Sequence, residues 1–438
     1  MLPLLMLALP RAFAAPAAGQ AGLPLRWQPP LEIATGAGLR GPWQQNDSRY
    51  DFVDDPSVVL AGDGSLVVAW VDQARKALLV QRRRPDGSAA DPPVEVARAP
   101  QTFSWIPRLA LVPGAPQRVL VLWQEIIFSG GSHGGEMMFA RSDDGGRSFS
   151  PPLNLSRSRG GDGKGRIDPS IWHNGSYELV ADADGRVVAA WTEYDGMLWV
   201  SASQDGGRSF AAPRLLAGAD GQRPTRAPAL AVQPGGAVYL AWTEGDNPAA
   251  DIRVARSEDG GATFAAAQVV APDPGYADAP SLALDRQGTL HLAFGHSESG
   301  PLGRQRILYT RSADGGRSFE PPRAISTPLP RPHVSAGYPS LAVDGRGGVY
   351  VVWELHPHPQ QRPRGLGMAV SADAGARFSA PVVVPGSLDP GGGTNGSSQG
   401  LLLRKLAVNG RGEVAVVNSS LREGSHSRVW LIRGHRAP

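Results

Sequence analysis

The octet Ser-Asp-Asp-Gly-Gly-Arg-Ser-Phe at residues 142–149 is repeated along the chain and decides the fold. Related octets begin at Ser203, Ser257 and Ser312, and a divergent copy begins at Ser371, which gives spacings of 61, 54, 55 and 59 residues. Each octet has the features of a hairpin turn, because its aspartate can accept backbone N–H groups, its glycines allow positive φ, and its phenylalanine can pack between sheets. A period of this length predicts a repeated β unit.

A second pattern runs in phase with the octets. Alternating strands end in a tryptophan or phenylalanine at residues 66–70, 119–123, 187–191, 238–242, 290–294 and 349–353, and residues 405–418 repeat the pattern without the aromatic. With the strand before it and the strands on either side of the octet, each unit contains four short antiparallel strands. The 55 glycines and 40 prolines agree with dense turns. We therefore predict an all-β chain folded as a β-propeller.

The number of blades follows from the strand that opens each unit. Such strands begin at Pro56, Pro107, Pro169, Pro228, Pro280 and Pro339, and a last one lies at Arg404. This predicts seven blades, with six as the alternative. The last unit ends with its third strand at residues 428–433, while residues 27–34 resemble the fourth strand at residues 149–156. We expect the N-terminal strand to complete the last blade, which would remove exposed sheet edges.

The two ends of the chain and its composition predict where it works. Residues 2–10 are almost purely apolar and are followed by small residues, as in a signal peptide spanning residues 1–18, so residues 25–434 would form a single propeller domain. We expect a secreted or periplasmic monomer without a membrane span. The chain has no cysteine, which excludes disulfides and thiolate metal sites, and its net charge of +3 does not indicate a nucleic-acid partner.

The octet resembles the Asp-box, or BNR repeat, of the sialidase superfamily, Ser-x-Asp-x-Gly-x-Thr/Ser-Trp/Phe. With its flanking strands the resemblance covers residues 55–386. Asp-boxes occur in hydrolases, lyases and non-enzymatic propellers, so the resemblance implies blade architecture and leaves the chemistry open. In that family the boxes lie on the face opposite the active site. We therefore expect the box aspartates to stabilise turns: Asp144, Asp205, Asp259, Asp314 and Asp373.

Propeller geometry places polar residues around the other face of the ring, at the mouth of the central channel. The entries of the first strands supply Asp54, Asp55, Trp105, Arg166, Asp168, Arg226, Tyr276, Asp278, Tyr338 and Arg404. The ends of the second strands supply Asp72, Glu125, Glu193, Glu244, His296 and Glu354. Such a mouth would suit a glycan or another polar or anionic ligand. Alternatively, these acids and arginines pair between adjacent blades and hold the loops in place.

The resemblance implies a specific mechanism for an enzyme of this kind. A sialidase holds the substrate carboxylate with three arginines, for which Arg166, Arg226 and Arg404 are the candidates. Tyr338 would be the nucleophile, with Glu193 or Glu354 as its partner. Asp55 or Asp54 would be the acid. The early Arg-Ile-Pro signature of the family is absent. The most similar stretch is Arg-Ile-Asp-Pro at residues 166–169.

Three function classes therefore remain open. The first is an exported glycoside hydrolase with exo-sialidase activity, and the second is a non-catalytic propeller that binds a glycan or takes part in assembly. The third is a metal-handling periplasmic protein that uses the loop histidines His133, His296, His333, His356 and His358. These histidines have no fixed spacing, which favours solvent-facing side chains over metal ligands. We predict no resident cofactor or metal.

Overall fold

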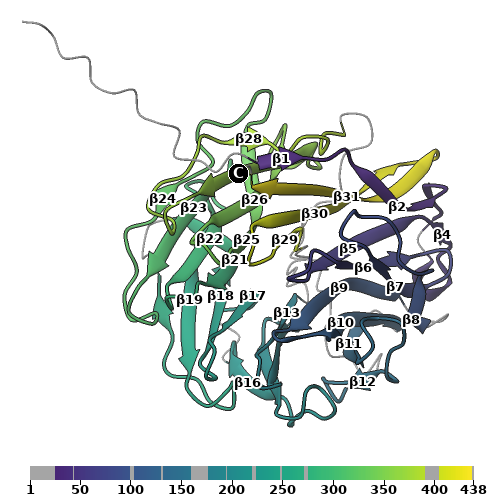
Figure 1. The fold of residues 1–438 in the computed structure, drawn as a ribbon, viewed down its shortest axis with the longest axis horizontal. Coiled ribbons are helices and arrows are strands. Elements are labelled where there is room, and N and C mark those ends of the chain that lie inside the picture. Colours follow the sequence, from purple (N-terminus) through teal and green to yellow (C-terminus); the bar gives the residue numbers. More distant parts are fainter. Residues whose placement is uncertain are drawn as a thin grey trace, which may run out of the picture.

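A computed structural model of the chain describes residues 25–42, 44–98, 103–129, 132–158, 176–193, 195–219, 223–246, 249–270, 275–389 and 404–436 (Figure 1). The expected signal peptide, residues 1–18, lies outside these residues. The described elements are strands, apart from one 3-10 turn, η1 (Gln45–Asp47). Within the ranges above, no helix is long and apolar enough to cross a membrane.

Consecutive strands pair antiparallel in groups, called units here and each named after its first strand, and four of the sheets have four strands. The β5 unit holds β5 (Val53–Leu60), β6 (Leu66–Asp72), β7 (Ala77–Arg83) and β8 (Val94–Arg98). The β9 unit holds β9 (Phe103–Val112), β10 (Ala115–Ser129), β11 (Ser132–Ser142) and β12 (Leu153–Asn154). The β13 unit holds β13 (Tyr177–Ala181), β14 (Val187–Thr192), β15 (Leu198–Ser203) and β16 (Arg214–Ala217).

The next three units repeat this order. The β17 unit holds β17 (Thr225–Val232), β18 (Val238–Asp246), β19 (Ala249–Ser257) and β20 (Gln268–Val269). The β21 unit holds β21 (Tyr276–Leu284), β22 (Leu290–Ser297), β23 (Arg306–Ser312) and β24 (Arg323–Ala324). The β25 unit holds β25 (Ser335–Val343), β26 (Val349–His356), β27 (Gly365–Ser371) and β28 (Val382–Val383). One parallel pair, Ala250 with Tyr276, joins the β17 and β21 units into an eight-stranded sheet.

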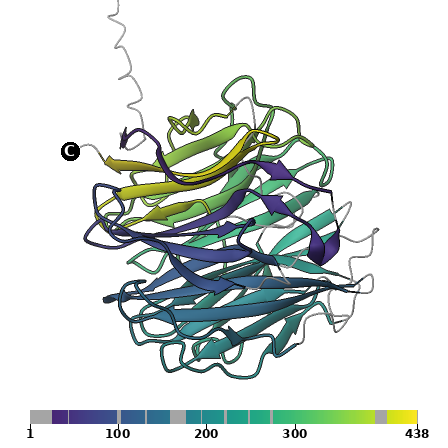
Figure 2. The same ribbon diagram turned by 90° about the vertical axis from the view of Figure 1, so that its right-hand side faces the viewer.

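The last unit, the β29 unit, combines the two ends of the described chain. It holds β29 (Leu406–Val408), β30 (Glu413–Arg422) and β31 (His426–Arg436), and β31 pairs with both β1 (Leu25–Trp27) and β2 (Leu31–Gly36). Figures 1 and 2 show the N-terminal strands, in purple, beside the C-terminal strands, in yellow. The expected pairing of the N-terminal strand with the last three-strand unit is confirmed. A short ribbon of β3 (Leu39–Arg40) and β4 (Tyr50–Asp51) follows.

The units are arranged as a β-propeller, as predicted. The first strands contact each other in the order β5, β9, β13, β17, β21, β25, β29 and back to β5, and they surround a common centre (Figure 1). One prediction about these strands is wrong. The third first strand was expected to begin at Pro169, but β13 begins at Tyr177 and pairs with β14 from there. Pro169 lies outside the described residues, and Tyr177 takes the place that proline has in the neighbouring units.

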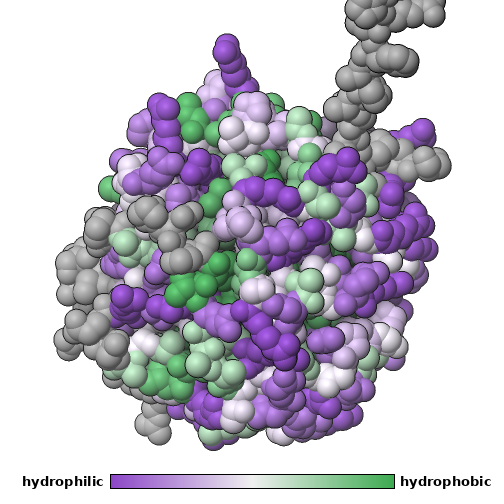
Figure 3. All heavy atoms as spheres, turned by 90° about the vertical axis from the view of Figure 1, so that its left-hand side faces the viewer, coloured by the Kyte–Doolittle hydropathy of each residue, from purple (hydrophilic) through white to green (hydrophobic). Residues whose placement is uncertain are grey.

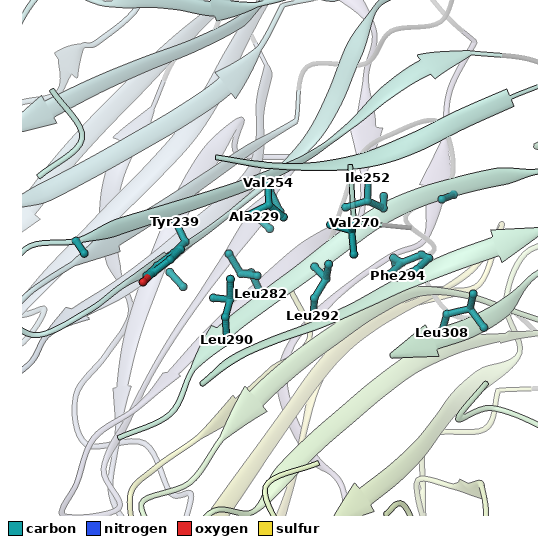
Figure 4. Close-up of a cluster of buried hydrophobic side chains, with 14 residues drawn as sticks. Ala229, Tyr239, Ile252, Val254, Val270, Leu282, Leu290, Leu292, Phe294 and Leu308 are labelled. Carbon is teal, nitrogen blue, oxygen red and sulfur yellow. The ribbon is translucent and has the colours of Figure 1, made fainter. Parts of the chain in front are cut away.

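The core lies between the sheets. In the cluster shared by the β17 and β21 units, Tyr239 and Val254 of one sheet face Leu292 and Phe294 of the next (Figure 4). The aromatic residues that end the second strands are all buried: Trp70, Trp123, Trp191, Trp242, Phe294 and Trp353. The side wall shown in Figure 3 is mostly polar, with apolar atoms in patches between polar ones. Burial of the alternating apolar face of each strand between two sheets is the main stabilisation that this architecture offers.

The octets form the tight hairpin turns that their sequence predicts. In the first, Asp144 Oδ1 accepts the backbone N–H groups of Arg147 and Ser148 at 2.8 and 3.0 Å, and Ser142 Oγ donates to the same oxygen at 2.7 Å. Hydrogen bonds of this kind hold the pKa of Asp259, in the third box, at about 2, with the Thr263 hydroxyl as the largest cause. The box aspartates are therefore turn-stabilising residues.

The boxes lie on the same face as the turns between first and second strands. The Gly206 N–H of one box donates to the Gly185 carbonyl at 2.8 Å, and the Ala374 N–H of another donates to the Gly347 carbonyl at 2.9 Å. Gly185 and Gly347 belong to turns that join a first strand to a second strand. This face is called the Asp-box face below, and the opposite one the mouth face.

Removing one box aspartate should weaken the fold without affecting the mouth face. Asp144→Ala leaves two backbone N–H groups and two serine hydroxyls without their carboxylate acceptor, and we expect a loss of about 1 kcal/mol in the free energy of unfolding because the turn is solvent-accessible. Urea titration of the full chain measures it. Asp184→Ala, an exposed turn residue on the same face, is the control and should change stability by less than about 0.5 kcal/mol. Equal losses in the two variants would contradict the role given to Asp144.

Candidate functional site

The first strands share a backbone irregularity where they enter the channel mouth. In five units, the residue before the proline of the first strand has a positive φ: Asp55 (51°), Ile106 (48°), Ala227 (58°), Ala279 (55°) and Tyr338 (55°). A shift of register accompanies it in each case, for example between Asp54 and Ser57. Each is a β-bulge, which re-aims side chains locally. Left-handed backbone is uncommon outside glycine and is most unusual for a bulky residue such as Tyr338.

Polar side chains connect neighbouring units along the first strands. Ser57 Oγ accepts the Leu109 N–H at 3.2 Å, Ser281 Oγ accepts the Leu341 N–H at 2.9 Å, and Ser340 Oγ accepts the Lys405 N–H at 3.0 Å. A first strand is the edge of its sheet, so these N–H groups have no sheet partner on that side. In the β5, β21 and β25 units, the serine that follows the proline therefore satisfies the edge of the next unit.

A second row of contacts lies nearer the mouth, and in two units it joins the residue after the aromatic position of the second strand to the bulge of the next unit. Thr243 Oγ1 donates to Asp278 Oδ1 at 2.9 Å and accepts the Ala279 N–H at 3.2 Å. Ser419 Oγ donates to Asp54 Oδ1. We call these contacts the mouth nodes. They confirm that part of the mouth-face charge is used to hold adjacent blades together, as the alternative interpretation of the sequence held.

Arg226 lies in the mouth node between the β17 and β21 units. Its Nε donates to Asp278 Oδ1 at 3.1 Å, its Nη2 to the Tyr276 hydroxyl at 2.5 Å, and its Nη1 to the Gly245 carbonyl at 2.6 Å. The guanidinium also lies over the Tyr276 ring. The three predicted mouth residues are thus brought together, and the Arg226 charge already has a carboxylate partner.

Tyr338 lies beside this cluster. Its half-buried side chain packs on Ala227 and Ala279, and its ring centroid is 6.3 Å from that of His356. Burial raises the pKa of the Tyr338 hydroxyl well above its usual value, and the carboxylates of Asp278 and Glu354 raise it further. Among the described residues the hydroxyl makes no hydrogen bond. Tyr338 is therefore a neutral phenol with its donor and acceptor available at the mouth.

Glu354, on the same unit as Tyr338, is fully buried in an ion pair with Lys405. His356 Nε2 is 3.5 Å from its other carboxylate oxygen. Burial alone would raise the pKa of Glu354, but the Lys405 ammonium and His356 outweigh it and lower this pKa to about 2. Glu354 is thus held as a carboxylate, and its lone pairs face cationic or imidazole groups of the protein.

Arg404 reaches across the central channel. It stands where five other units have proline, and its Nε donates to Glu178 Oε2 of the β13 unit at 2.6 Å. Its Nη groups point to the carbonyl oxygens of Pro228, Pro280 and Pro339, at 3.2 to 3.4 Å. Glu178 is also 3.8 Å from the buried Arg108. Arg404 therefore bridges five units through the channel, and a carboxylate ligand would have to compete with Glu178 for it.

The remaining predicted site residues are more widely separated. Glu193 lies in the turn between β14 and β15, in the β13 unit, whereas Tyr338 is in the β25 unit. Asp55 Oδ2 accepts the Ile106 N–H at 3.2 Å. The neighbouring Asp54 has a pKa raised by burial, which is the property required of a general acid. Arg166 and Asp168 lie outside the described residues.

Sequence reasoning missed Lys405, Glu178 and Gln305, which lie within or beside these contacts. Lys405 had a usable signal, because it is one of three lysines in the chain and stands where other units have serine.

No group of three or more acidic or histidine side chains capable of holding a metal occurs among the residues described in the structure. His296 and His356 are buried at the mouth, and the side chain of His133 lies outside the described residues.

Comparison with known proteins agrees with the fold. A family model for the BNR repeat-like domain matches residues 77–351. No curated protein matches. A Dyadobacter fermentans protein of unknown function is 14% identical over 94% of this chain and 99% of its own, with a TM-score of 0.50.

Two carbohydrate-active enzymes are among the similar solved structures. An ulvan lyase of family PL25, bound to -[GlcA(1-4)Rha3S]-, is 12% identical over 87% of this chain and 93% of its own, with a TM-score of 0.55. A Hadza microbial sialidase is 20% identical over 69% of this chain and 63% of its own, with a TM-score of 0.44. At these identities the likeness to the lyase and to the Dyadobacter protein shows the fold alone.

The buried pair of Glu354 and Lys405 should be one of the largest local contributions to stability at the mouth. Glu354→Gln leaves the Lys405 ammonium buried without its counter-charge, so we expect a loss of about 3–5 kcal/mol in the free energy of unfolding, measured by urea titration at pH 7. The double variant Glu354→Leu/Lys405→Met removes both charges and should recover most of it. A double variant as unstable as the single one would contradict the pairing.

Proposed function

Because the chain belongs to the BNR repeat-like domain family, we propose that it is an exported, seven-bladed propeller that recognises a glycan at its mouth face. The observation that carries the proposal is Tyr338. It is a half-buried phenol on strained left-handed backbone, with no hydrogen bond among the described residues and with Arg226, Asp278 and His356 around it. Backbone strain of this kind concentrates at functional sites.

The blade number is supported by the repeat of strand order. The β17 and β21 halves of the eight-stranded sheet are joined by a single residue pair, and each half repeats the four-strand order of the other units. With the β29 unit completed by β2, seven units then surround the channel. Export is supported by the apolar residues 2–10, which are followed by small residues as in a signal peptide.

The chemistry of the mouth suits a sugar. Tyrosine and histidine rings offer flat apolar faces, and hydroxyl, guanidinium and carboxylate groups offer hydrogen bonds in several directions, as sites for polar small molecules require. Arg226, Lys405 and Arg404 each have a carboxylate partner within the protein. Binding therefore rests more on hydrogen bonds and ring contacts than on a free clamp of arginines. The similar ulvan lyase, which was solved bound to -[GlcA(1-4)Rha3S]-, supports a carbohydrate ligand by fold analogy only.

Sialidase-like hydrolysis is the second candidate, because Tyr338 lies near two carboxylates, Asp278 and Glu354. In that reaction the Tyr338 oxygen would bond to the anomeric carbon and give its proton to a carboxylate, and a protonated aspartate, Asp54 or Asp55, would give its proton to the departing sugar oxygen. Water would then hydrolyse the glycosyl-tyrosine bond. The raised pKa of Tyr338 makes this step depend on Asp278 or Glu354 accepting the proton during attack.

A glycan array and a fluorogenic sialoside together test both candidates. The mature chain should bind a defined subset of glycans, and Tyr338→Phe should weaken that binding about tenfold, since one hydrogen bond to the sugar is lost. If the chain is a hydrolase, it releases the fluorophore and Tyr338→Phe abolishes release. Tyr239→Phe, a buried tyrosine beside the Asp-box residue Gly315, is the matched control and should behave as wild type. Failure of the wild-type chain to bind any glycan contradicts the proposal.

A further inference from the structure

The mouth node between the β21 and β25 units differs from those at the interfaces β13–β17, β17–β21, β25–β29 and β29–β5. At three of them, the side chain after the aromatic position of the second strand contacts the next unit: Thr243, Glu354 and Ser419. At the β13–β17 interface, Thr192 bonds to Ser176, whose Oγ accepts the Ala227 N–H of the β17 unit. The corresponding residue of the β21 unit is Gly295. The residue facing it from the β25 unit, two before the proline, is Gly337, where the β21 and β5 units have Asp278 and Asp54.

Backbone conformation does not account for these two glycines. Neither Gly295 nor Gly337 has a left-handed φ, so an ordinary side chain would be tolerated by the backbone at both positions. Space accounts for them instead. A Cβ on Gly337 would lie 2.9 Å from Oε1 of Gln305, and a Cβ on Gly295 would lie 3.2 Å from the same oxygen. The two glycines thus make room for the amide of Gln305.

Two hydrogen bonds hold the backbone of Gln305 in place. Gln305 precedes β23, and its N–H donates to Ser335 Oγ at 2.9 Å while its carbonyl accepts the Ala336 N–H at 2.9 Å. Both partners begin β25, the strand that carries Tyr338. Within the described part of the chain, the side-chain amide of Gln305 makes no hydrogen bond. A half-buried amide whose two donors and one acceptor have no partner among the described residues is available to a ligand.

The surroundings place this amide at the proposed site. The same Cβ position on Gly337 is 3.9 Å from Nε2 of His356, and His356 is the ring neighbour of Tyr338. His356 is itself oriented, because Nδ1 bonds to the Gln361 carbonyl at 2.9 Å and therefore donates to it. Gln305, His356 and Tyr338 thus border one position at the mouth, between the β21 and β25 units.

We propose that Gln305 binds the ligand directly and determines specificity, in a recess that Gly295 and Gly337 open beside Tyr338. This inference rests on the proposed function and narrows it. An amide that both donates and accepts is complementary to a pair of adjacent hydroxyl groups on a sugar ring, in which one hydroxyl donates and the other accepts. A site built around such an amide rejects a sugar that lacks either hydroxyl, because the amide would then be left unpaired.

The test compares three variants of the full chain on the same glycan array. Gln305→Ala removes the amide and should reduce binding at least tenfold on the glycans that wild type binds. Gly337→Ala fills the recess and displaces only the flexible end of Gln305, so it should also reduce binding while the chain stays folded. Gln287→Ala, in the turn between β21 and β22 on the Asp-box face, is the matched control and should bind as wild type.

Thermal melting of each variant separates ligand binding from folding. We expect melting temperatures within about 2 °C of wild type, since Gln287 is exposed, the Gln305 amide makes no hydrogen bond among the described residues, and the end of Gln305 can move away from a methyl group on the buried Gly337. Wild-type binding by Gln305→Ala overturns the inference and leaves the proposed glycan function standing. Loss of binding together with a lowered melting temperature shows that Gln305 is structural and also overturns it. A wild-type chain that binds no glycan overturns the proposed function, and the inference with it.

Discussion

The unpaired inner edge of each first strand is the constraint on which this structure depends. A propeller blade ends at the channel with a strand whose outward N–H groups have no sheet partner, and buried N–H groups without acceptors are strongly unfavourable. Here the neighbouring unit supplies the acceptor, through the serine that follows the proline and through the hydroxyl or carboxylate of the mouth nodes. The polar residues of the repeat are therefore explained first as links between units. Arg404 adds a bridge through the channel itself.

The β21 and β25 units are joined by the Ser281 link and by the backbone of Gln305, but at their mouth node two glycines stand where other units have linking side chains. Gly295 and Gly337 replace the linking side chains, Gln305 enters from a loop, and Tyr338 lies next to it on left-handed backbone. Two side chains at this node, Gln305 and Tyr338, make no hydrogen bond among the described residues, and this distinguishes the candidate binding site from the structural contacts at the other nodes.

Much of the fold could be predicted from local sequence. The Asp-box turns depend on contacts within eight residues, and the closure of the last unit by residues 31–36 follows from a strand pattern that is repeated elsewhere in the chain. The third first strand could not be placed, because Asp168-Pro169 imitates the signal while the strand itself has Tyr177 where proline is expected. The pairing of Arg404 with Glu178 joins residues 226 apart in sequence, and no local pattern carries it. Gln305 was missed because a loop residue has no fixed phase in the repeat, although the two glycines at polar positions of the repeat were a usable signal.

The central claim is that ligand meets the mouth face and that the Asp-box face serves stability. Hydrogen–deuterium exchange, with and without a glycan identified on the array, measures this directly. The account predicts slower exchange in peptides that cover residues 295–305 and 335–339, with no change in the box turns at residues 142–149 and 312–319. Protection confined to the box turns, with unchanged exchange around Tyr338, would contradict it.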